Sequence, residues 1–320
     1  MLIVAILVVS GVGFYYVQSS GHGQESSTGP IKVTDSLNRT FYFQSPVTRI
    51  VSIDPAATAT LYALGAYKDL VGGNEFDSYP PSESIPNVGD SYSINYQMLV
   101  NLTPQVVLVY GSTFSSVDQK INNTLNIPVI VDNPNSISQI MSFTSMLGNL
   151  TGTEHNATLI NNWVRQSVTI LRDSVPSVNQ SSEESVFYYL SNYGGIWTMG
   201  QNTFINQMFQ IAKLRNIVSF SGSGTINAEV IVNQSPDILL LDQYVPVSAA
   251  NVAPFNETAA YYSSPQRIYT IFNDSFFDEP DFRIVYSIYW LISTMYPSSM
   301  PSLPQFPIKL AYPPTTGFSY

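Results

Sequence analysis

The sequence of 320 residues contains no cysteine. This absence excludes disulfide bonds, zinc sites built from thiolates, and a membrane anchor attached through a lipid-modified cysteine. The only histidines are His22, in a predicted linker, and His155, at the start of a predicted helix. Two histidines cannot supply the sites of several imidazoles and carboxylates that bind zinc or manganese directly. A Ser-His-Asp triad is excluded as well, because neither histidine is expected beside a nucleophile.

Charged residues are also scarce, at 11% of the chain, and 22 acidic residues against 12 basic ones give a net charge of −10. A negative net charge repels phosphate, so the sequence predicts no nucleic acid partner. Hydroxyl and amide side chains, together with 21 tyrosines, supply much of the polar surface instead.

Residues 1–17, MLIVAILVVSGVGFYYV, carry no charge and are followed by a polar linker at 18–30. We interpret the run as a signal peptide or membrane anchor, and the sequence leaves its cleavage open. We therefore expect an extracellular protein, either secreted or held at the outer face of the cell membrane by this segment.

Nine Asn-x-Ser/Thr sequons agree with export and predict a glycoprotein. The nine asparagines are Asn38, Asn101, Asn122, Asn149, Asn156, Asn179, Asn233, Asn256 and Asn273. Pro104 and Pro236 directly follow the sequons of Asn101 and Asn233 and hinder their modification.

Two stretches of the chain repeat one another. The segment 94-INYQMLVNLTPQVVLVY-110 reappears without a gap as 226-INAEVIVNQSPDILLLD-242. Each copy combines apolar residues at helical spacing, a proline that ends the helix, and an aliphatic run. A run that is apolar on both faces is typical of a parallel strand covered by helices on both sides. The repeat therefore predicts two similar α/β lobes.

Other segments predict the elements around each copy. The alternating segment 31-IKVTDSLNRTFYF-43 predicts an antiparallel hairpin, and residues 49–73 predict a buried strand, a turn at Asp54 and a helix. We interpret residues 196–218 as the second copy of this strand, turn and helix. It pairs the apolar positions Phe204, Met208 and Ile211 with Ala57, Leu61 and Leu64.

A long amphipathic helix is predicted at residues 157–175, between the two lobes, and the proline-rich tail should be irregular. The predicted fold class is α/β, with two similar lobes built on mostly parallel central sheets and joined by one long helix. The predicted domains are a signal peptide or anchor at 1–17, a linker at 18–30, an N-terminal lobe at 31–150, a bridging helix at 151–178, a C-terminal lobe at 179–297 and the tail at 298–320.

The chain resembles the substrate-binding proteins of ABC importers for cobalamin, iron siderophores and haem. The residues that carry the resemblance are VTDSLNRTFYF, RIVSIDPAATATLYALGA, VGGNEFDSYPP, LGNLTG, the two repeats and the block at 273–296, all in family order. Together with the sparse charge and the sequons, it indicates an archaeal cell-surface protein. The resemblance implies the helical-backbone periplasmic-binding-protein fold, with one ligand held between the lobes.

The loops that the resemblance implies for ligand contact are rich in aromatic residues. In cobalamin-binding relatives, aromatic side chains that pack against the corrin occupy positions similar to Phe76, Tyr92, Tyr110, Trp197 and Phe276. Large rigid rings bind a flat apolar macrocycle at a low cost in conformational entropy. The full set of expected ligand-binding residues is Asp54, Phe76, Tyr92, Tyr110, Tyr193, Trp197, Tyr244, Phe276 and Phe277.

The expected ligand is a metal chelate, such as a cobalamin or other corrinoid, a ferric siderophore or haem. The loops contain no basic residue except nearby Arg283, which we expect at the start of the last helix, so they favour a neutral or cationic ligand. The acidic run at 274–281 predicts a solvated turn, with cation binding as the alternative. A run at 221-SGSGT-225 lacks the GxSxG pattern of a hydrolase nucleophile and predicts a turn.

We predict no enzymatic activity, no catalytic residue, no cofactor and no metal held by side chains. The alternative is a cell-surface hydrolase that acts on glycans through a pair of carboxylates. The resemblance implies an ABC permease dimer with its ATPase subunits as the partner of a monomeric binding protein. In the family, a glutamate on each lobe docks to arginine-rich pockets of the permease; the matching residues are Glu229 and, as a departure from that pattern, Gln97.

Overall fold

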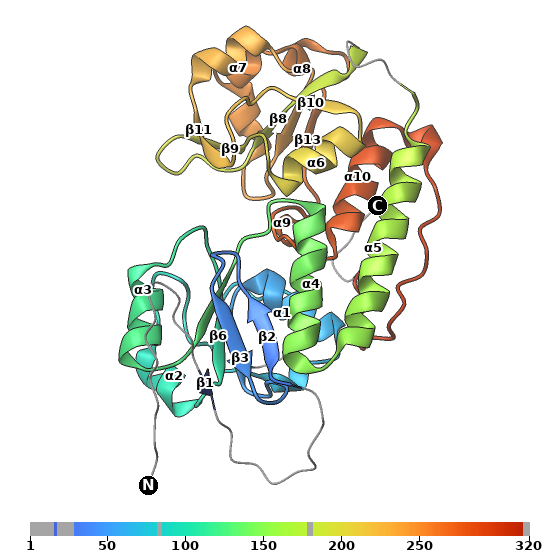
Figure 1. Cartoon of the computed structure of the whole chain (residues 1–320). Helices are drawn as coiled ribbons and strands as arrows, with labels where there is room; N and C mark the ends of the chain where they lie inside the picture. Colours follow the sequence, from blue (N-terminus) through green and yellow to red (C-terminus); the bar gives the residue numbers. More distant parts are fainter. Residues whose placement is uncertain (1–15, 18–28, 82–84, 178–181, 316–320) are drawn as a thin grey trace, which may run out of the picture. The chain divides into compact units, whose positions relative to one another are not determined.

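The computed structural model describes residues 16–17, 29–81, 85–177 and 182–315 (Figure 1). Almost all of the predicted signal or anchor segment, most of the linker and the sequon at Asn179 lie outside these residues. Within the described part of the chain, no helix combines the length and the apolar character needed to cross a membrane.

The chain forms two compact units. The first comprises Met1–Pro134, Met141–Asn161 and Ile308–Tyr312, and the second comprises Asn135–Ile140, Asn162–Pro307 and Pro313–Tyr320. The sequence repeat had predicted two such α/β bodies.

The first unit is built on a sheet of four parallel strands in the order β5-β4-β6-β7. The strands are β4 (Ile50–Ile53), β5 (Leu70–Gly72), β6 (Val106–Tyr110) and β7 (Val129–Asp132). All four residues of β4 and of β7 are buried, which explains why these strands lack polar alternation.

The predicted hairpin forms a separate small sheet in the first unit. Strands β2 (Ile31–Thr34) and β3 (Thr40–Phe43) pair in antiparallel fashion, and the two-residue β1 (Tyr16–Val17) runs parallel to β3. The pair Thr34 and Thr40 closes the hairpin next to its turn.

The second unit repeats the parallel sheet, in the order β10-β8-β12-β13. Its strands are β8 (Glu184–Tyr189), β10 (Leu214–Asn216), β12 (Ile238–Leu241) and β13 (Ile268–Thr270). Strands β6 and β12, which end the two copies of the repeat, hold the same place in their sheets. The repeat therefore encodes equivalent strands, as predicted.

One predicted correspondence is wrong. The strand before the helix at residue 204 is β9 (Ile196–Met199), which pairs with β11 (Ser223–Ile226) in a two-stranded antiparallel sheet. The equivalent of β4 is instead β8, because β8 occupies the matching place in the parallel sheet. The predicted turn at residues 221–225 is likewise wrong for Ser223, Gly224 and Thr225, which belong to β11.

Short helices cover the sheets. In the first unit they are α1 (Pro55–Ala63), α2 (Tyr96–Asn101), α3 (Ser116–Gln119), the 3-10 turn Tyr67–Asp69 and the π turn Lys120–Thr124. In the second unit they are α6 (Phe204–Ile211), α7 (Ala228–Gln234), α8 (Ala259–Tyr262), α9 (Asp274–Phe277), α10 (Ile284–Met295) and the 3-10 turns Val247–Asn251, Phe255–Glu257 and Pro297–Ser299. The apolar positions that the sequence paired on α1 and α6 are all buried.

Two longer helices have residues in both units. The predicted long helix is α5 (Glu154–Ser174), and α4 (Ile137–Thr151) precedes it. The boundary between the units falls after Ile140 in α4 and after Asn161 in α5. The chain thus connects the units at more places than the single long helix that the sequence indicated.

The proline-rich tail has no regular secondary structure at residues 300–315. In the second unit, the Nε1 atom of Trp163 donates a hydrogen bond of 2.9 Å to the carbonyl of Pro304. In the first unit, Tyr79 Oη donates to the carbonyl of Tyr312 at 2.7 Å, and Tyr312 N donates to Tyr62 Oη at 2.8 Å. The tail is therefore held by both units although it is irregular.

Candidate ligand-binding site

The first unit places several of the expected residues just beyond the carboxyl ends of its strands. Asp54 directly follows β4 and caps α1, since its Oδ1 atom accepts a hydrogen bond of 2.9 Å from Ala56 N. Tyr110 is the last residue of β6, and Asp132 is the last residue of β7. Open parallel sheets bind ligands at this edge. Asp54 is only 1% exposed, so its main contact is with the helix that it caps.

Three aromatic side chains of the first unit are turned to solvent. Phe76 is 64% exposed, Tyr92 94% and Tyr110 43%. Aspartate and asparagine side chains fix the backbone at the first two. Phe76 N donates to Asn74 Oδ1 at 2.6 Å, and Tyr92 N donates to Asp90 Oδ1 at 2.7 Å. These turns hold large rings outside the core, where the rings add nothing to core packing.

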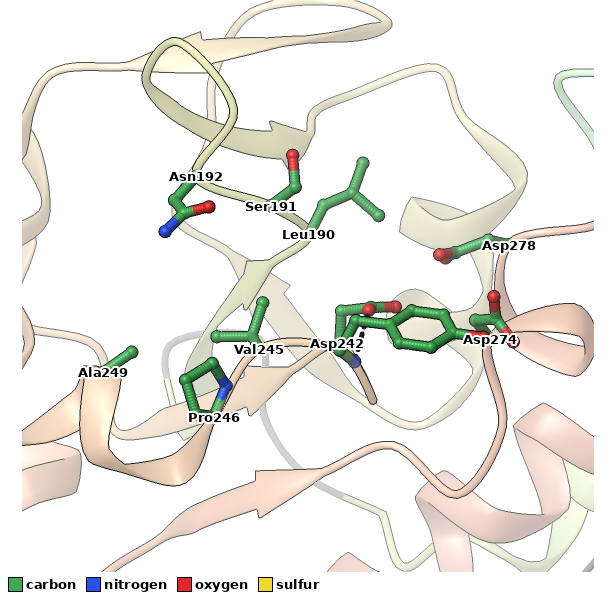
Figure 2. Close-up of a pocket in the computed structure, with 10 residues that line it drawn as sticks. Leu190, Ser191, Asn192, Asp242, Val245, Pro246, Ala249, Asp274 and Asp278 are labelled. Carbon is green, nitrogen blue, oxygen red and sulfur yellow. Dashed lines mark hydrogen bonds between the residues drawn. The ribbon is translucent and has the colours of Figure 1, made fainter.

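The second unit contains a pocket with a volume of about 410 Å³ at the carboxyl ends of β8 and β12 (Figure 2). Leu190 and Ser191 follow β8, and Asp242 follows β12, so the parallel sheet brings these side chains together. The complete lining is Leu190, Ser191, Asn192, Asp242, Tyr244, Val245, Pro246, Ala249, Asp274 and Asp278. The lining combines apolar side chains with carboxylates and contains no basic residue.

A buried tyrosine joins two of the pocket carboxylates. Tyr188 Oη lies 2.9 Å from Asp278 Oδ1 and 3.3 Å from Asp242 Oδ2. Burial, and then the charge of Asp242, raise the pKa of Asp278 well above its ordinary range. Burial is also the main cause of the raised pKa of Asp242. The pocket therefore presents carboxyl groups that resist ionisation.

The expected aromatic residues of the second unit divide into exposed and buried groups. Tyr193 is 88% exposed and Tyr244 is 77% exposed, and Tyr244 also lines the pocket. Trp197 is half-buried in β9, and its Nε1 atom donates to the carbonyl of Tyr193 at 2.8 Å. Trp197 thus holds the loop that presents Tyr193.

Phe276 and Phe277 are core residues, at 2% and 0% exposure. Both rings pack near α10, since Phe276 meets Tyr286 edge to face at 6.0 Å and Phe277 meets Trp290 edge to face at 6.0 Å. In this structure they offer almost no surface to a ligand. Contact of these two rings with a ligand stays a prediction, and their burial does not support it.

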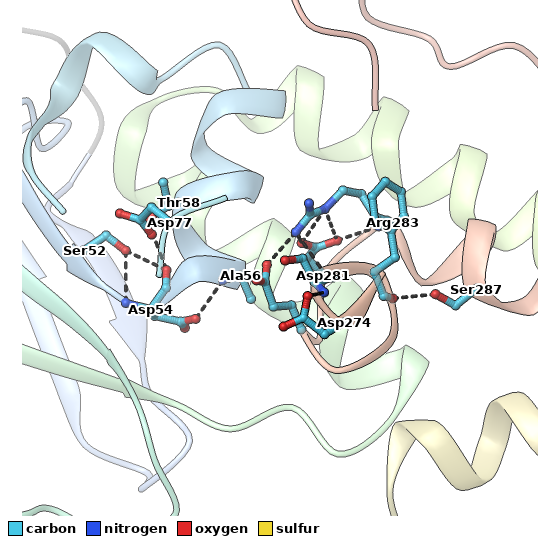
Figure 3. A network of polar contacts seen from close by, with 12 residues as sticks. Ser52, Asp54, Ala56, Thr58, Asp77, Asp274, Asp281, Arg283 and Ser287 are labelled. Carbon is cyan, nitrogen blue, oxygen red and sulfur yellow. Dashed lines mark hydrogen bonds and ion pairs between the residues drawn. The ribbon is translucent and has the colours of Figure 1, made fainter. Parts of the chain in front are cut away.

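The acidic run at 274–281 is not the solvated turn that the sequence indicated. Arg283 is 1% exposed at the start of α10, as predicted, and its Nη2 atom lies 2.6 Å from both Asp281 Oδ2 and Glu279 Oε2 (Figure 3). Buried charges are tolerated when they are paired in this way. Two of the four carboxylates of the run, Glu279 and Asp281, thus form an internal ion-pair network with Arg283 between α9 and α10.

In the described part of the chain, no group of three or more His, Asp or Glu side chains has the geometry to hold a metal ion. His155 is exposed at the start of α5. The alternative interpretation of the acidic run as a cation site therefore has no geometric support among these residues.

The two residues expected at the permease lie in equivalent first turns. Gln97 is exposed on α2, behind the cap Asn95, and its Nε2 atom donates to Asn101 Oδ1 at 3.0 Å. Glu229 is exposed on α7, where Asn227 Oδ1 caps Glu229 N at 2.9 Å. Both side chains are accessible from solvent.

Sequence reasoning missed Tyr188. It considered Asp274 and Asp278 only as part of the acidic run, and it did not count Asp242, Asp274 or Asp278 among the ligand-binding residues. Tyr188 lies in the apolar strand β8. The sequence of this strand alone does not show that the tyrosine hydroxyl bonds carboxylates at the carboxyl end of the sheet. The signal that could have found Asp242 is its position directly after a predicted parallel strand, as at Asp54.

Comparison with known proteins gives relatives along most of the chain. The family model described as periplasmic binding protein matches residues 50–259. An uncharacterized ABC transporter substrate-binding lipoprotein of Bacillus subtilis is 25% identical over 254 residues, which cover 78% of this chain and 81% of that protein. A cobalamin-binding protein of Halobacterium salinarum is 28% identical over 246 residues, which cover 72% of this chain and 66% of that protein.

Solved structures agree with the architecture. A possible iron-binding periplasmic solute-binding protein from Staphylococcus epidermidis superposes with a TM-score of 0.68 at 24% identity, covering 79% of this chain and 100% of that chain. The periplasmic vitamin B12 binding protein of Vibrio cholerae gives a TM-score of 0.65 at 19% identity, covering 78% of this chain and 97% of that chain. At these identities the likeness shows the fold, and the α/β fold expected from the sequence is confirmed.

Proposed function

Because the chain belongs to the periplasmic binding protein family, we propose that it is the extracellular substrate-binding component of an ABC importer. In this role it binds a metal chelate, such as a corrinoid, a ferric siderophore or haem, and delivers it to a membrane permease. The partners are the permease dimer and its ATPase subunits. The protein acts as a monomer that binds its ligand and catalyses no reaction. Its N-terminal segment directs it to the outer face of the membrane or holds it there.

The observation that carries this proposal is the set of exposed aromatic rings at the carboxyl ends of the parallel strands and in the loops that follow these strands. The rings are Phe76, Tyr92, Tyr110, Tyr193 and Tyr244, with exposures between 43% and 94%. A large ring held in water by a fixed turn contributes little to folding, whereas it gains free energy when a flat ligand covers it. Surface aromatics of this kind are typical of binding sites for large apolar ligands.

The charge of the pocket supports a neutral or cationic ligand periphery. The lining contains Asp242, Asp274 and Asp278 and no lysine or arginine. A highly anionic chelate would meet like charge or unionised carboxyl groups here, and neither favours it. Amide, hydroxyl or ammonium groups on the ligand suit the same oxygens.

We propose that the exposed first turns of α2 and α7 dock to the permease when the ligand is delivered. Glu229 offers a negative charge that an arginine can pair, whereas Gln97 offers only hydrogen bonds. We therefore expect docking in which α7 contributes more than α2. The cobalamin-binding and iron-binding descriptions of the relatives support the ligand class without identifying one ligand.

Titration calorimetry of single alanine variants with cobalamin, haem and a ferric siderophore tests the proposal. Tyr92→Ala, Tyr193→Ala and Tyr244→Ala should each weaken binding of the active chelate by about 1 to 3 kcal/mol, because each removes a large contact surface. Tyr262→Ala is the matched control, since Tyr262 is 73% exposed but lies on α8 rather than in one of the loops expected to contact the ligand. Equal losses in the control and the loop variants would overturn the assignment.

A further inference from the structure

The sequons of the chain can be sorted by their structural environment. N-linked modification requires that the side-chain nitrogen Nδ2 of the asparagine is reachable, with a hydroxyl residue two positions later, and it is found on exposed surface loops. Eight of the nine sequon asparagines belong to the described residues, the exception being Asn179.

Four of these eight use or bury their side-chain amide. Asn122 is 5% exposed and donates to Asn123 Oδ1 at 2.7 Å. In helices α4 and α5, Asn149 Nδ2 donates to the carbonyl of Lys32 at 3.0 Å and Asn156 Nδ2 donates to that of Leu64 at 2.9 Å. Asn256 Nδ2 donates to the carbonyl of Asn251 at 3.3 Å, and its hydroxyl partner Thr258 is fully buried.

Three further sequons are blocked in other ways. Asn101 and Asn233 lie at or near helix ends, and a proline follows each of their sequons directly. The Oδ1 atom of Asn273 is buried without a hydrogen-bond partner, and the hydroxyl residue of this sequon, Ser275, is 8% exposed.

The remaining sequon, Asn38-Arg39-Thr40, runs from the turn between β2 and β3 into the first residue of β3. Asn38 is exposed in the left-handed region, at φ 59°, which asparagine tolerates better than most residues. The turn does not need its side chain, because Asp35 Oδ1 accepts from Leu37 N at 3.0 Å and from Arg39 N at 2.8 Å. The backbone N–H of Asn38 donates to the carbonyl of Asp35 at 3.0 Å, whereas its side-chain amide has no hydrogen-bond partner among the described residues.

We propose that Asn38 is an N-glycosylation site of this protein. A bond forms between Asn38 Nδ2 and the anomeric carbon of a glycan donated by a lipid-linked sugar phosphate. The bond between that carbon and the phosphate oxygen breaks, the lipid phosphate leaves, and the amide loses one proton. The glycan adds polar surface to a chain in which only 11% of residues are charged. This inference rests on the proposed function only in requiring that the chain is exported.

Mass spectrometry of proteolytic peptides from the protein purified from its native host tests the assignment. The peptide that contains Asn38 should carry a glycan mass in most molecules, and the peptide that contains Asn122 should carry none. An unmodified Asn38, or a glycan on Asn122, would overturn the proposal.

Variants expressed in the same host separate the sequon from the fold. Thr40→Val should abolish the modification because it removes the sequon hydroxyl, whereas Thr40→Ser should retain it. Asn38→Gln should lower the intact mass by one glycan and leave the affinity for cobalamin, haem or a ferric siderophore unchanged. If Thr40→Val remains glycosylated at Asn38, the sequon assignment is refuted. This outcome is independent of whether the titrations detect binding of a chelate.

Discussion

Replacing Asp132 by asparagine should change how the free energy of unfolding of this protein depends on pH. Asp132 ends β7 and is 5% exposed. Its Oδ1 atom accepts a hydrogen bond of 3.2 Å from Ser36 Oγ, while Oδ2 is buried without a hydrogen-bond partner. Burial, followed by the nearby charge of Asp54, raises the pKa of Asp132 to about 8.

The sign of the effect follows from proton binding. In the unfolded chain Asp132 has an ordinary pKa of about 4, so between pH about 4 and pH about 8 the folded state binds more protons. Stability is then fully present below pH about 4 and falls as the pH rises through the folded pKa. A difference of about four units, at about 1.4 kcal/mol each, gives an upper bound of about 6 kcal/mol. Asparagine has the shape of the protonated acid and does not titrate, so Asp132→Asn removes this dependence.

Urea unfolding of wild type and Asp132→Asn at pH values from about 4.5 to about 9 measures the difference. The wild type should lose several kcal/mol of unfolding free energy over this range, and the variant should lose less and be the more stable protein at the alkaline end. Asp173→Asn, at an exposed position of α5, is the control and should follow the wild type. Parallel pH profiles for wild type and Asp132→Asn would refute the reasoning.

Three other substitutions test separate parts of the structure. Tyr188→Phe removes the hydroxyl that bonds two pocket carboxylates and should lower the unfolding free energy by about 1.5 to 3 kcal/mol; an unchanged urea midpoint would contradict the cluster. Tyr79→Phe removes the hydrogen bond to the carbonyl of Tyr312 and should cost about 1 kcal/mol and speed proteolysis of the tail, whereas unchanged cleavage would show that the bond does not hold the tail. Glu229→Gln should impair stimulation of the cognate permease in vesicles far more than Gln97→Ala, with ligand affinity unchanged; transport equal to wild type would remove the docking role and leave only helix capping.

The fold was accessible from the sequence because its signals are local and repeated. The aliphatic runs of β6 and β12 and the prolines before them define the same unit twice. The turn at Asp54 was predictable because aspartate is a favoured N-cap residue and proline, here Pro55, is favoured at the first position of a helix.

The errors arose where tertiary contacts decide. The short sequence of strand β9, IWTM, does not reveal its partner, and only its pairing with β11 shows that it lies outside the parallel sheet. Phe276 and Phe277 follow a strand in a polar context, yet α10 covers both rings. Glu279 and Asp281 tolerate burial because Arg283 pairs with both, and charge counting cannot reveal such a pairing.

Native mass spectrometry of the purified chain, after incubation with a soluble extract of its host cells, tests metal-chelate binding most directly. We predict one noncovalent adduct that contains a metal ion and whose visible absorption identifies it as a corrinoid, haem or ferric siderophore. Combined replacement of Tyr92, Tyr193 and Tyr244 by alanine should remove the adduct, and Tyr262→Ala should retain it. An adduct without metal, such as an oligosaccharide, or the absence of any adduct would contradict the proposed function.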